Sequence, residues 1–330
     1  MPAIKIVLDI TRLVKEGKLT AQDAERLQAL AKRDTGSLAI NVLMSFGAVA
    51  VAAGIIGLEP AFTTGAALGV ALVAIGLVIS FFAAQQWGLL GTATTIIGAL
   101  LLAGGVIGFV EADFAGLAFS ALLFLALAVA IRSNFLIALV PLVLAGALGS
   151  STGYAHAVYM LTVNEPSITI AFFALLAGAA YIVSKHVGQG YQQLAITFAR
   201  VSLILVNFGF WIGSLWGDYP GETWAQGEGS RLWSNREAWR AAHLHIPEIA
   251  FIVGWAIVII AVGAWAARAN RRWVVTTAAV FGAIEFYTQW FERLGAEPWA
   301  IIVAGLTIVA FAIALWRYNV THGRPATATA

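Results

Sequence analysis

Glu285 is the residue whose type and position most strongly suggest chemistry, because it interrupts an apolar segment long enough to cross a membrane. Charged side chains are costly inside a bilayer, where they usually mark a function or a tight pairing. Gln289 follows one helical turn later, and in an earlier apolar segment Arg200 and Asn207 share one helix face. If the two segments are neighbours, these four residues form a polar track in which Glu285 binds a proton or a cation. The alternative is that Glu285 hydrogen-bonds a neighbouring helix or reaches water on the outer side.

A second candidate is the polar segment 218–246, DYPGETWAQGEGSRLWSNREAWRAAHLHI. A capping box, Ser234-x-x-Glu237, predicts a short helix that ends before Pro247. Trp side chains on one face and Arg side chains on another are typical of a helix that lies in the headgroup region. The segment is therefore predicted to be an interfacial lid. Its aromatic and cationic members are Trp224, Trp233, Trp239, Arg236 and Arg240.

A metal site in the same segment would use His243, His245 and Glu248, with His156 from another loop as a further ligand. Residues two apart point to roughly opposite sides of a helix, whereas a helical zinc pair uses residues four apart. The lid is therefore favoured over the metal site, and no cofactor is expected.

Other chemistry is scarce. The chain has no Cys, no phosphate-binding loop, no Gly-rich dinucleotide turn and no nucleophile elbow. Its five His residues all fall outside the apolar segments, which counts against a haem held between helices. An enzyme is the less favoured class.

Composition indicates what positions these residues. Of 330 residues, 60% are hydrophobic and 11% charged, whereas a soluble domain has about 25% charged residues. We therefore expect an all-α polytopic membrane protein with about ten transmembrane helices, a small N-terminal helical hairpin and one outer amphipathic helix. The predicted spans are residues 38–57, 62–84, 89–110, 114–131, 135–153, 167–184, 194–217, 247–267, 273–292 and 298–317.

The predicted order along the chain is a cytoplasmic hairpin over 1–37, seven spans over 38–217, the outer segment over 218–246, three spans over 247–317 and a disordered tail over 318–330. With the amino terminus inside, fifteen of the nineteen Lys and Arg residues lie on the inner side, and no inner connection after residue 38 contains Asp or Glu. The positive-inside rule thus predicts that both termini are cytoplasmic.

Small residues recur every fourth position on three predicted spans, at Gly65/Gly69, Gly104/Gly108 and Gly209/Gly213/Gly217. Such faces let helix backbones approach closely, either within the chain or in a homo-oligomer or a complex with another membrane protein. Nucleic acid is not an expected partner, because five acidic residues accompany the seven basic ones before Leu38.

The N-terminal hairpin is predicted from two helical patterns, the first over Ile4–Val14 and closed by Gly17, the second opened by Thr20 as N-cap with Asp23 three residues later. The stretch LVKEGKLTAQDAERLQALAKR (Leu13–Arg33), followed by a small-residue apolar segment, resembles the start of an uncharacterised family of bacterial predicted membrane proteins. The resemblance covers about residues 8–57 and implies a bacterial cytoplasmic (inner) membrane location with many apolar helices. It implies no activity and no catalytic residues.

Two functions follow as hypotheses. The first is a transporter or permease for a small solute or ion, with Glu285 as the coupling carboxylate. The second is a non-catalytic membrane subunit, scaffold or assembly partner whose Gly faces and Trp-rich outer segment are docking surfaces.

Overall fold

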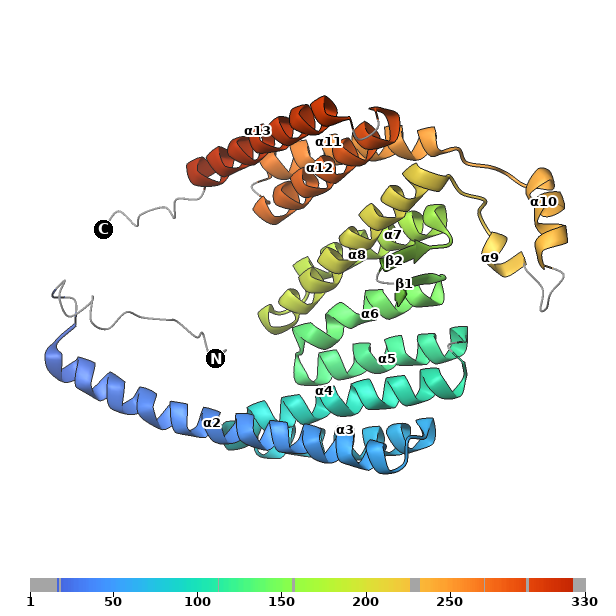
Figure 1. Ribbon diagram of the computed structural model, residues 1–330. Coiled ribbons are helices and arrows are strands. Elements are labelled where there is room, and N and C mark those ends of the chain that lie inside the picture. The colour runs from blue at the N-terminus through green and yellow to red at the C-terminus, as the bar shows by residue number, and fades with distance from the viewer. Residues whose placement is uncertain are drawn as a thin grey trace. The chain divides into compact units, whose positions relative to one another are not determined.

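A computed structural model describes residues 17, 19–111, 113–155, 158–225, 232–269, 271–294 and 297–322 (Figure 1). The chain divides into two compact units. The first comprises residues 1–147 and 178–201, and the second comprises residues 148–177 and 202–330. The predicted first hairpin helix and most of the predicted tail lie outside the described residues, as does His156.

The first unit is a row of helices in which α3, α4, α5 and α6 each pack on the next along the chain, while α2 packs mainly on α4 (Figure 1). Its described helices are α2 (Ala21–Leu58), α3 (Phe62–Phe82), α4 (Ala84–Phe109), α5 (Phe114–Ile131) and α6 (Asn134–Ala147), and it also contains the end of α7 (Pro166–His186) and the beginning of α8 (Gln189–Trp216). Its core lies between α4, α5 and α6, where Ala99, Ala128 and Leu136 are fully buried.

Helix α2 begins as predicted and then continues further than predicted. The Thr20 side chain accepts a hydrogen bond from the Asp23 backbone N–H at 3.1 Å, which confirms it as the N-cap. The helix runs without a break past residue 37, so the second hairpin helix and the first predicted span form one helix. Asn41 fixes α2 to α4, because its amide donates to the Gln86 carbonyl and accepts from the Leu90 N–H, on either side of the non-helical Trp87.

Most glycines of the predicted faces are closely packed within the chain, whereas Gly104 has open space around it. A Cβ atom on Gly98 of α4 would lie 2.5 Å from the Val73 backbone nitrogen of α3, and Gly69 is equally close to the Leu102 backbone. Gly209 and Gly213 are likewise covered by Ile170 and Phe251. Close helix packing in a membrane depends on such small residues, since no hydrophobic force drives the helices together.

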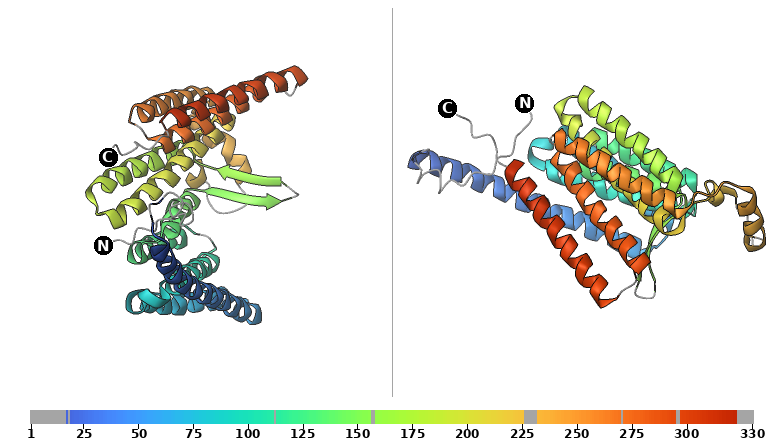
Figure 2. Two further views of the ribbon diagram at one scale, coloured as in Figure 1. Left: turned by 90° about the vertical axis from the view of Figure 1, so that its left-hand side faces the viewer. Right: turned by 90° about the horizontal axis from the view of Figure 1, so that it is seen from above.

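The second unit contains a β-hairpin followed by helices. Strand β1 (Ser150–Ala155) pairs antiparallel with β2 (Val158–Val163), and Figure 2 shows the two as adjacent arrows. The helices are the beginning of α7, the rest of α8, and then α9 (Glu222–Ala225), α10 (Leu232–Ala242), α11 (Glu248–Arg268), α12 (Arg272–Leu294) and α13 (Pro298–His322).

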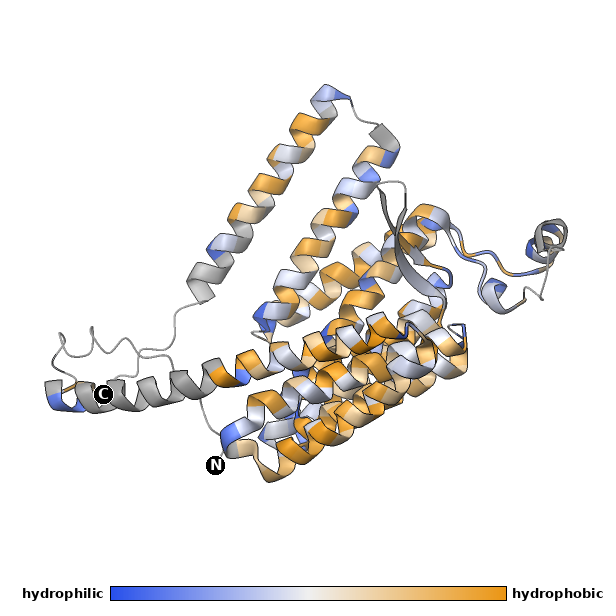
Figure 3. Cartoon of the chain, turned by 60° about the horizontal axis from the view of Figure 1, so that its bottom comes forward, coloured by the Kyte–Doolittle hydropathy of each residue, from blue (hydrophilic) through white to orange (hydrophobic). Residues whose placement is uncertain are grey.

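Seven described helices are long and apolar enough to cross a membrane: 40–58 within α2, α3, 86–109 within α4, α5, α7, α8 and α11. Their surfaces are apolar as well (Figure 3): Phe46, Leu175 and Ile260 are 68%, 74% and 70% exposed. Side chains of this size are rarely so exposed to water, and lipid is the solvent that suits them. The helices are thus consistent with an integral membrane protein.

The predicted count of about ten spans is not confirmed, and the fifth predicted span is wrong at its end. Helix α6 stops at Ala147, where Gly149 has a φ of +86°, and residues 150–153 of the predicted span form β1 instead. Helix α12 is 23 residues long, but Glu285 and Glu292 lower its apolar character. In α13 the apolar stretch among described residues is Ile301–Ala310.

Candidate functional site

Glu285 is buried on α12, with 9% of its surface exposed. It follows Phe281 by four residues and precedes Thr288 by three, so the three share one helix face. That face meets α8: the Phe281 ring packs edge-on against Phe208 at 5.9 Å between centroids, and Trp211 Nε1 donates to the Thr288 hydroxyl at 3.1 Å. The requirement that α8 and α12 be neighbours is therefore met.

Helix α11 closes the other side of this face. Gly282 of α12 lies against Ile259, and the Phe281 and Trp255 rings are 6.5 Å apart. Trp255 is fully buried and stacks on Phe210 of α8 with an interplanar angle of 3°. Glu285 is thus placed where α8, α11 and α12 meet in an aromatic core.

Polar groups without partners gather on this part of α12. Among the described residues, Glu285 has no hydrogen-bond or ion-pair partner. One turn further on, Gln289 has its Nε2 buried with no partner, and so does the indole Nε1 of Trp290. Buried polar groups are nearly always hydrogen-bonded in native proteins, so polar groups without a protein partner single out this part of α12 as a candidate binding site. Because the two ends of a Gln amide are interchangeable in assignment, Gln289 can present an oxygen as readily as a nitrogen.

Two more residues belong to the predicted polar track, Asn207 and Arg200. Asn207 is fully engaged elsewhere: its Oδ1 accepts from Trp255 Nε1 at 2.9 Å and its Nδ2 donates to the Leu203 carbonyl at 2.8 Å. Arg200 lies in the part of α8 that belongs to the first unit. Helix spacing places Gln289 one turn from Glu285 on α12, and the described contacts give Asn207 a role in holding Trp255.

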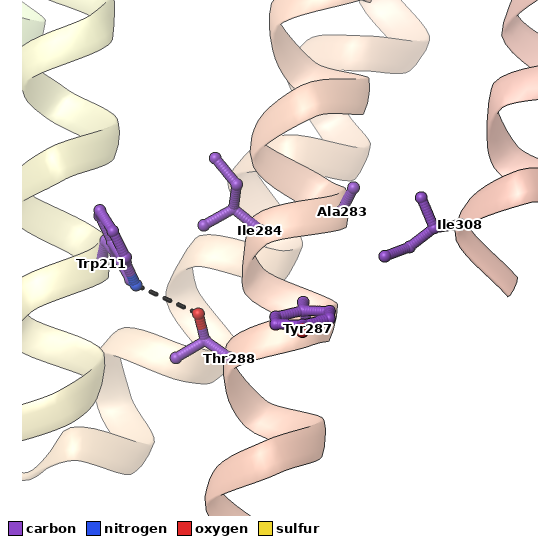
Figure 4. A pocket seen from close by; sticks show the side chains of 6 residues that line it. All are labelled: Trp211, Ala283, Ile284, Tyr287, Thr288 and Ile308. Carbon is purple, nitrogen blue, oxygen red and sulfur yellow. Dashed lines mark hydrogen bonds between the residues drawn. The ribbon is translucent and has the colours of Figure 1, made fainter. Parts of the chain in front are cut away.

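Two cavities flank the three-helix core. The larger, about 310 Å³, is apolar and lies between α8, α12 and α13 (Figure 4). Its lining comprises Trp211, Ala283, Ile284, Tyr287, Thr288 and Ile308. The smaller, about 50 Å³, lies between α8, α11 and α12 and has Asn207 and Thr277 in its wall. Space for a small ligand or for water therefore exists on α12 beside the Glu285 face.

The outer segment is closed at its base. Asp218 and Ile246 exchange two backbone hydrogen bonds of 2.9 Å, so the end of α8 and the start of α11 are joined. Gly217 has a φ of +65°, and a Cβ there would lie 2.8 Å from the Ile246 carbonyl oxygen, so only glycine fits the turn. The Asp218 carboxylate also accepts from the Ser167 N–H at 2.8 Å, which caps the first turn of α7.

Three carboxylates organise this region, and each has partners. Glu165 is fully buried and accepts from the Gly221 and Thr223 N–H groups, both at 2.7 Å. Burial raises the pKa of Asp218, against the lowering effect of its hydrogen bonds from Ser167. For Glu222, burial would raise the pKa, but hydrogen bonds from Arg240 and Arg236 outweigh it and lower the pKa to about 2.

The predicted lid residues take part in this network. Arg236 and Arg240 both pair with Glu222, and Arg240 also lies over the Tyr219 ring at 4.7 Å. Trp239 stacks on His243 at 3.8 Å, and Trp224 is exposed. Helix α10 begins at Leu232, two residues before the predicted Ser234 cap, so that prediction is wrong. The Trp233 side chain lies outside the described part of the chain.

Within the described ranges, no group of three or more His, Cys, Asp or Glu is placed to hold a metal ion. His243 stacks on Trp239 and His245 stacks on Tyr219 at 4.5 Å, so the two imidazoles serve different rings. Glu248 lies in the first turn of α11, where its negative charge interacts favourably with the helix dipole.

Fold and site together describe an integral membrane bundle with a buried carboxylate and an ordered polar segment outside the spans. In comparisons with protein-family models, curated proteins and solved structures, none matches this chain.

Proposed function

We propose that this protein is a membrane transporter for a small solute or ion, in which Glu285 binds the coupling proton or cation. The observation that supports it is the unsatisfied polar face of α12: a buried carboxylate at Glu285 and a buried amide at Gln289, one turn apart, with no partner among the described residues. An unpaired intramembrane carboxylate is costly and therefore points to a function.

Placement in the bacterial cytoplasmic membrane with both termini inside belongs to the same proposal. It rests on the distribution of Lys and Arg along the sequence and on the N-terminal resemblance to the uncharacterised membrane-protein family.

The test is cation flux in vesicles that contain the purified full-length chain. A proton or sodium gradient is imposed and its collapse is followed with a dye inside the vesicle. We expect the wild type to dissipate one of the two gradients, and we expect that gradient to persist in vesicles with Glu285→Gln. Glu292→Gln, which removes an exposed carboxylate two turns further along α12, is the matched control and should behave as wild type. Equal flux through wild type and Glu285→Gln would end the proposal.

A membrane scaffold is the second candidate, and one observation favours it. On α2, the glycines Gly47, Gly54 and Gly57 have open space where a side chain would be, whereas Gly69 of α3 and Gly98 of α4 lie against backbone atoms. A free small-residue face on an exposed helix fits a partner helix. Gentle purification distinguishes the two functions: a stoichiometric partner that is lost with Gly54→Leu supports the scaffold.

A further inference from the structure

Two turns of the first unit are in contact, and a basic residue lies in or beside each of them. Arg132, in the α5–α6 turn, has its guanidinium carbon 5.1 Å from the centre of the Tyr191 ring. Gly190 leaves room for it, since a Cβ there would lie 3.3 Å from the same carbon. The two turns are also tied by a hydrogen bond from the Thr197 hydroxyl to Asn134 Oδ1 at 3.3 Å.

The backbone conformation of Arg132 is unusual for a residue with a side chain. Its φ is +53°, in the left-handed region, and it ends α5 at the position where helices usually have glycine. A non-glycine residue in this conformation is disfavoured and is a reason to look for function.

A second cation flanks the same pair of turns. Lys185, at the end of α7, lies over the Tyr181 ring at 4.6 Å and is exposed, as are Arg132 and Tyr191. Neither cation has an ion-pair partner among the described residues, and the sequence contains no Asp or Glu between 114 and 164 or between 166 and 217. The helices α5, α6, α7 and α8 therefore offer these cations no carboxylate.

We infer that Arg132, with Lys185 and Tyr191, binds the phosphate of an anionic phospholipid headgroup. A guanidinium stacked on an aromatic ring keeps its N–H edge free, and that edge matches a phosphate bidentately. Basic sites at the membrane ends of helices recognise anionic headgroups, and Tyr is enriched at that level. The positive charge of the two side chains is complementary to the negative charge of the headgroup. Of the helices that the two turns connect, α5, α7 and α8 are long and apolar enough to span a membrane. The site is independent of transport at Glu285.

The full-length chain in detergent is titrated with phosphatidylglycerol, and in parallel with phosphatidylcholine as the neutral lipid. Native mass spectrometry counts the lipids that stay bound. Wild type should retain one phosphatidylglycerol selectively. Arg132→Gly suits the left-handed backbone, so it should fold at least as well while binding phosphatidylglycerol about tenfold more weakly, as expected for a lost charge-assisted contact. Arg132→Lys keeps the charge but loses the two parallel N–H donors of the guanidinium, so its affinity for phosphatidylglycerol should be intermediate.

Arg268→Gln is the matched control, since it removes an exposed cation from the end of α11 in the other unit. It should bind as wild type; an equal loss would show diffuse attraction and overturn the site. Undiminished binding by Arg132→Gly would overturn it as well. Inorganic phosphate that displaces the lipid at equal concentration would overturn the lipid assignment in favour of a free phosphate.

Discussion

The ion pairs of Glu222 give a prediction about the outer segment. Its Oε1 accepts from Arg236 Nε at 2.5 Å and from Arg240 Nε at 2.8 Å, and its Oε2 accepts from Arg240 Nη2 at 2.8 Å. These contacts link α9 to α10. Glu222→Gln keeps the shape of the side chain but removes the charge that both guanidinium groups face, so α10 should open more often.

The magnitude follows from the pKa. A fall of the Glu222 pKa from 4.5 to about 2 corresponds to about 3 kcal/mol of stabilisation when the group is fully ionised. Because the Arg side chains are 35% and 36% exposed, solvent screening reduces this to about 1–2 kcal/mol. The folded pKa is depressed, so the contribution is present above pH 4.5 and is lost as the pH falls through about 2.

Amide hydrogen exchange of α10, measured by mass spectrometry, is the assay. At neutral pH, Glu222→Gln should exchange about tenfold faster in α10 than wild type, since each 1.4 kcal/mol is about a factor of ten. Acidification should then raise opening of α10 in wild type, beyond the intrinsic pH effect, and not in the variant. Glu237→Gln, an exposed acid on the same helix, is the control. Equal α10 protection in wild type and Glu222→Gln would refute the reasoning.

Three further predictions concern packing and burial. Gly98→Ala should destabilise the fold by about 1–3 kcal/mol because the new methyl group meets backbone atoms of α3. Gly104→Ala, with open space around it, should be neutral or slightly stabilising. Thermal unfolding of both variants in detergent is the measurement. Asp218→Asn keeps an acceptor for the α7 amide but removes a buried charge. Because the pKa of Asp218 is raised in the fold, the wild type becomes more stable as the pH falls. The variant should therefore be at least as stable as wild type at neutral pH and should lose this pH dependence. Trp255→Phe should cost about 1–3 kcal/mol by leaving the Asn207 oxygen unsatisfied, and a second change, Asn207→Leu, should cost less in that background than alone.

Sequence patterns predicted the apolar helices better than the segments that connect them. Seven predicted spans correspond to helices able to cross a membrane, because a long apolar run has few other stable states. The fifth predicted span was wrong at its end because hydropathy alone does not distinguish the end of an apolar helix from an apolar strand. A turn at Gly149 and the aromatic and β-branched residues of Val158–Val163 were the available signals for the hairpin.

The candidate site was predicted in part for a related reason. A lone acid in an apolar segment is visible in sequence, so Glu285 could be singled out. The partner of Asn207 could not, because Trp255 lies 48 residues away and its approach depends on helix packing. Glu165 and Asp218 were missed as organising residues since their partners are mainly backbone N–H groups, which every residue type but proline shares.

The outer segment and the buried carboxylate are connected through the helices they share. Within the second unit, the Asp218–Ile246 hydrogen bonds join the end of α8 to the start of α11, while Trp255 and Asn207 join the same helices further along. Helix α12, which contains Glu285, has no corresponding link to Asp218 or Ile246 among the described residues. Its polar contact with α8 is the hydrogen bond from Trp211 to Thr288. Helix α12 is instead held against α11, on which it packs closely. Because Thr288 lies one helical turn from Glu285 and also lines the larger cavity, the hydrogen bond from Trp211 joins α8 to the part of α12 that holds the carboxylate.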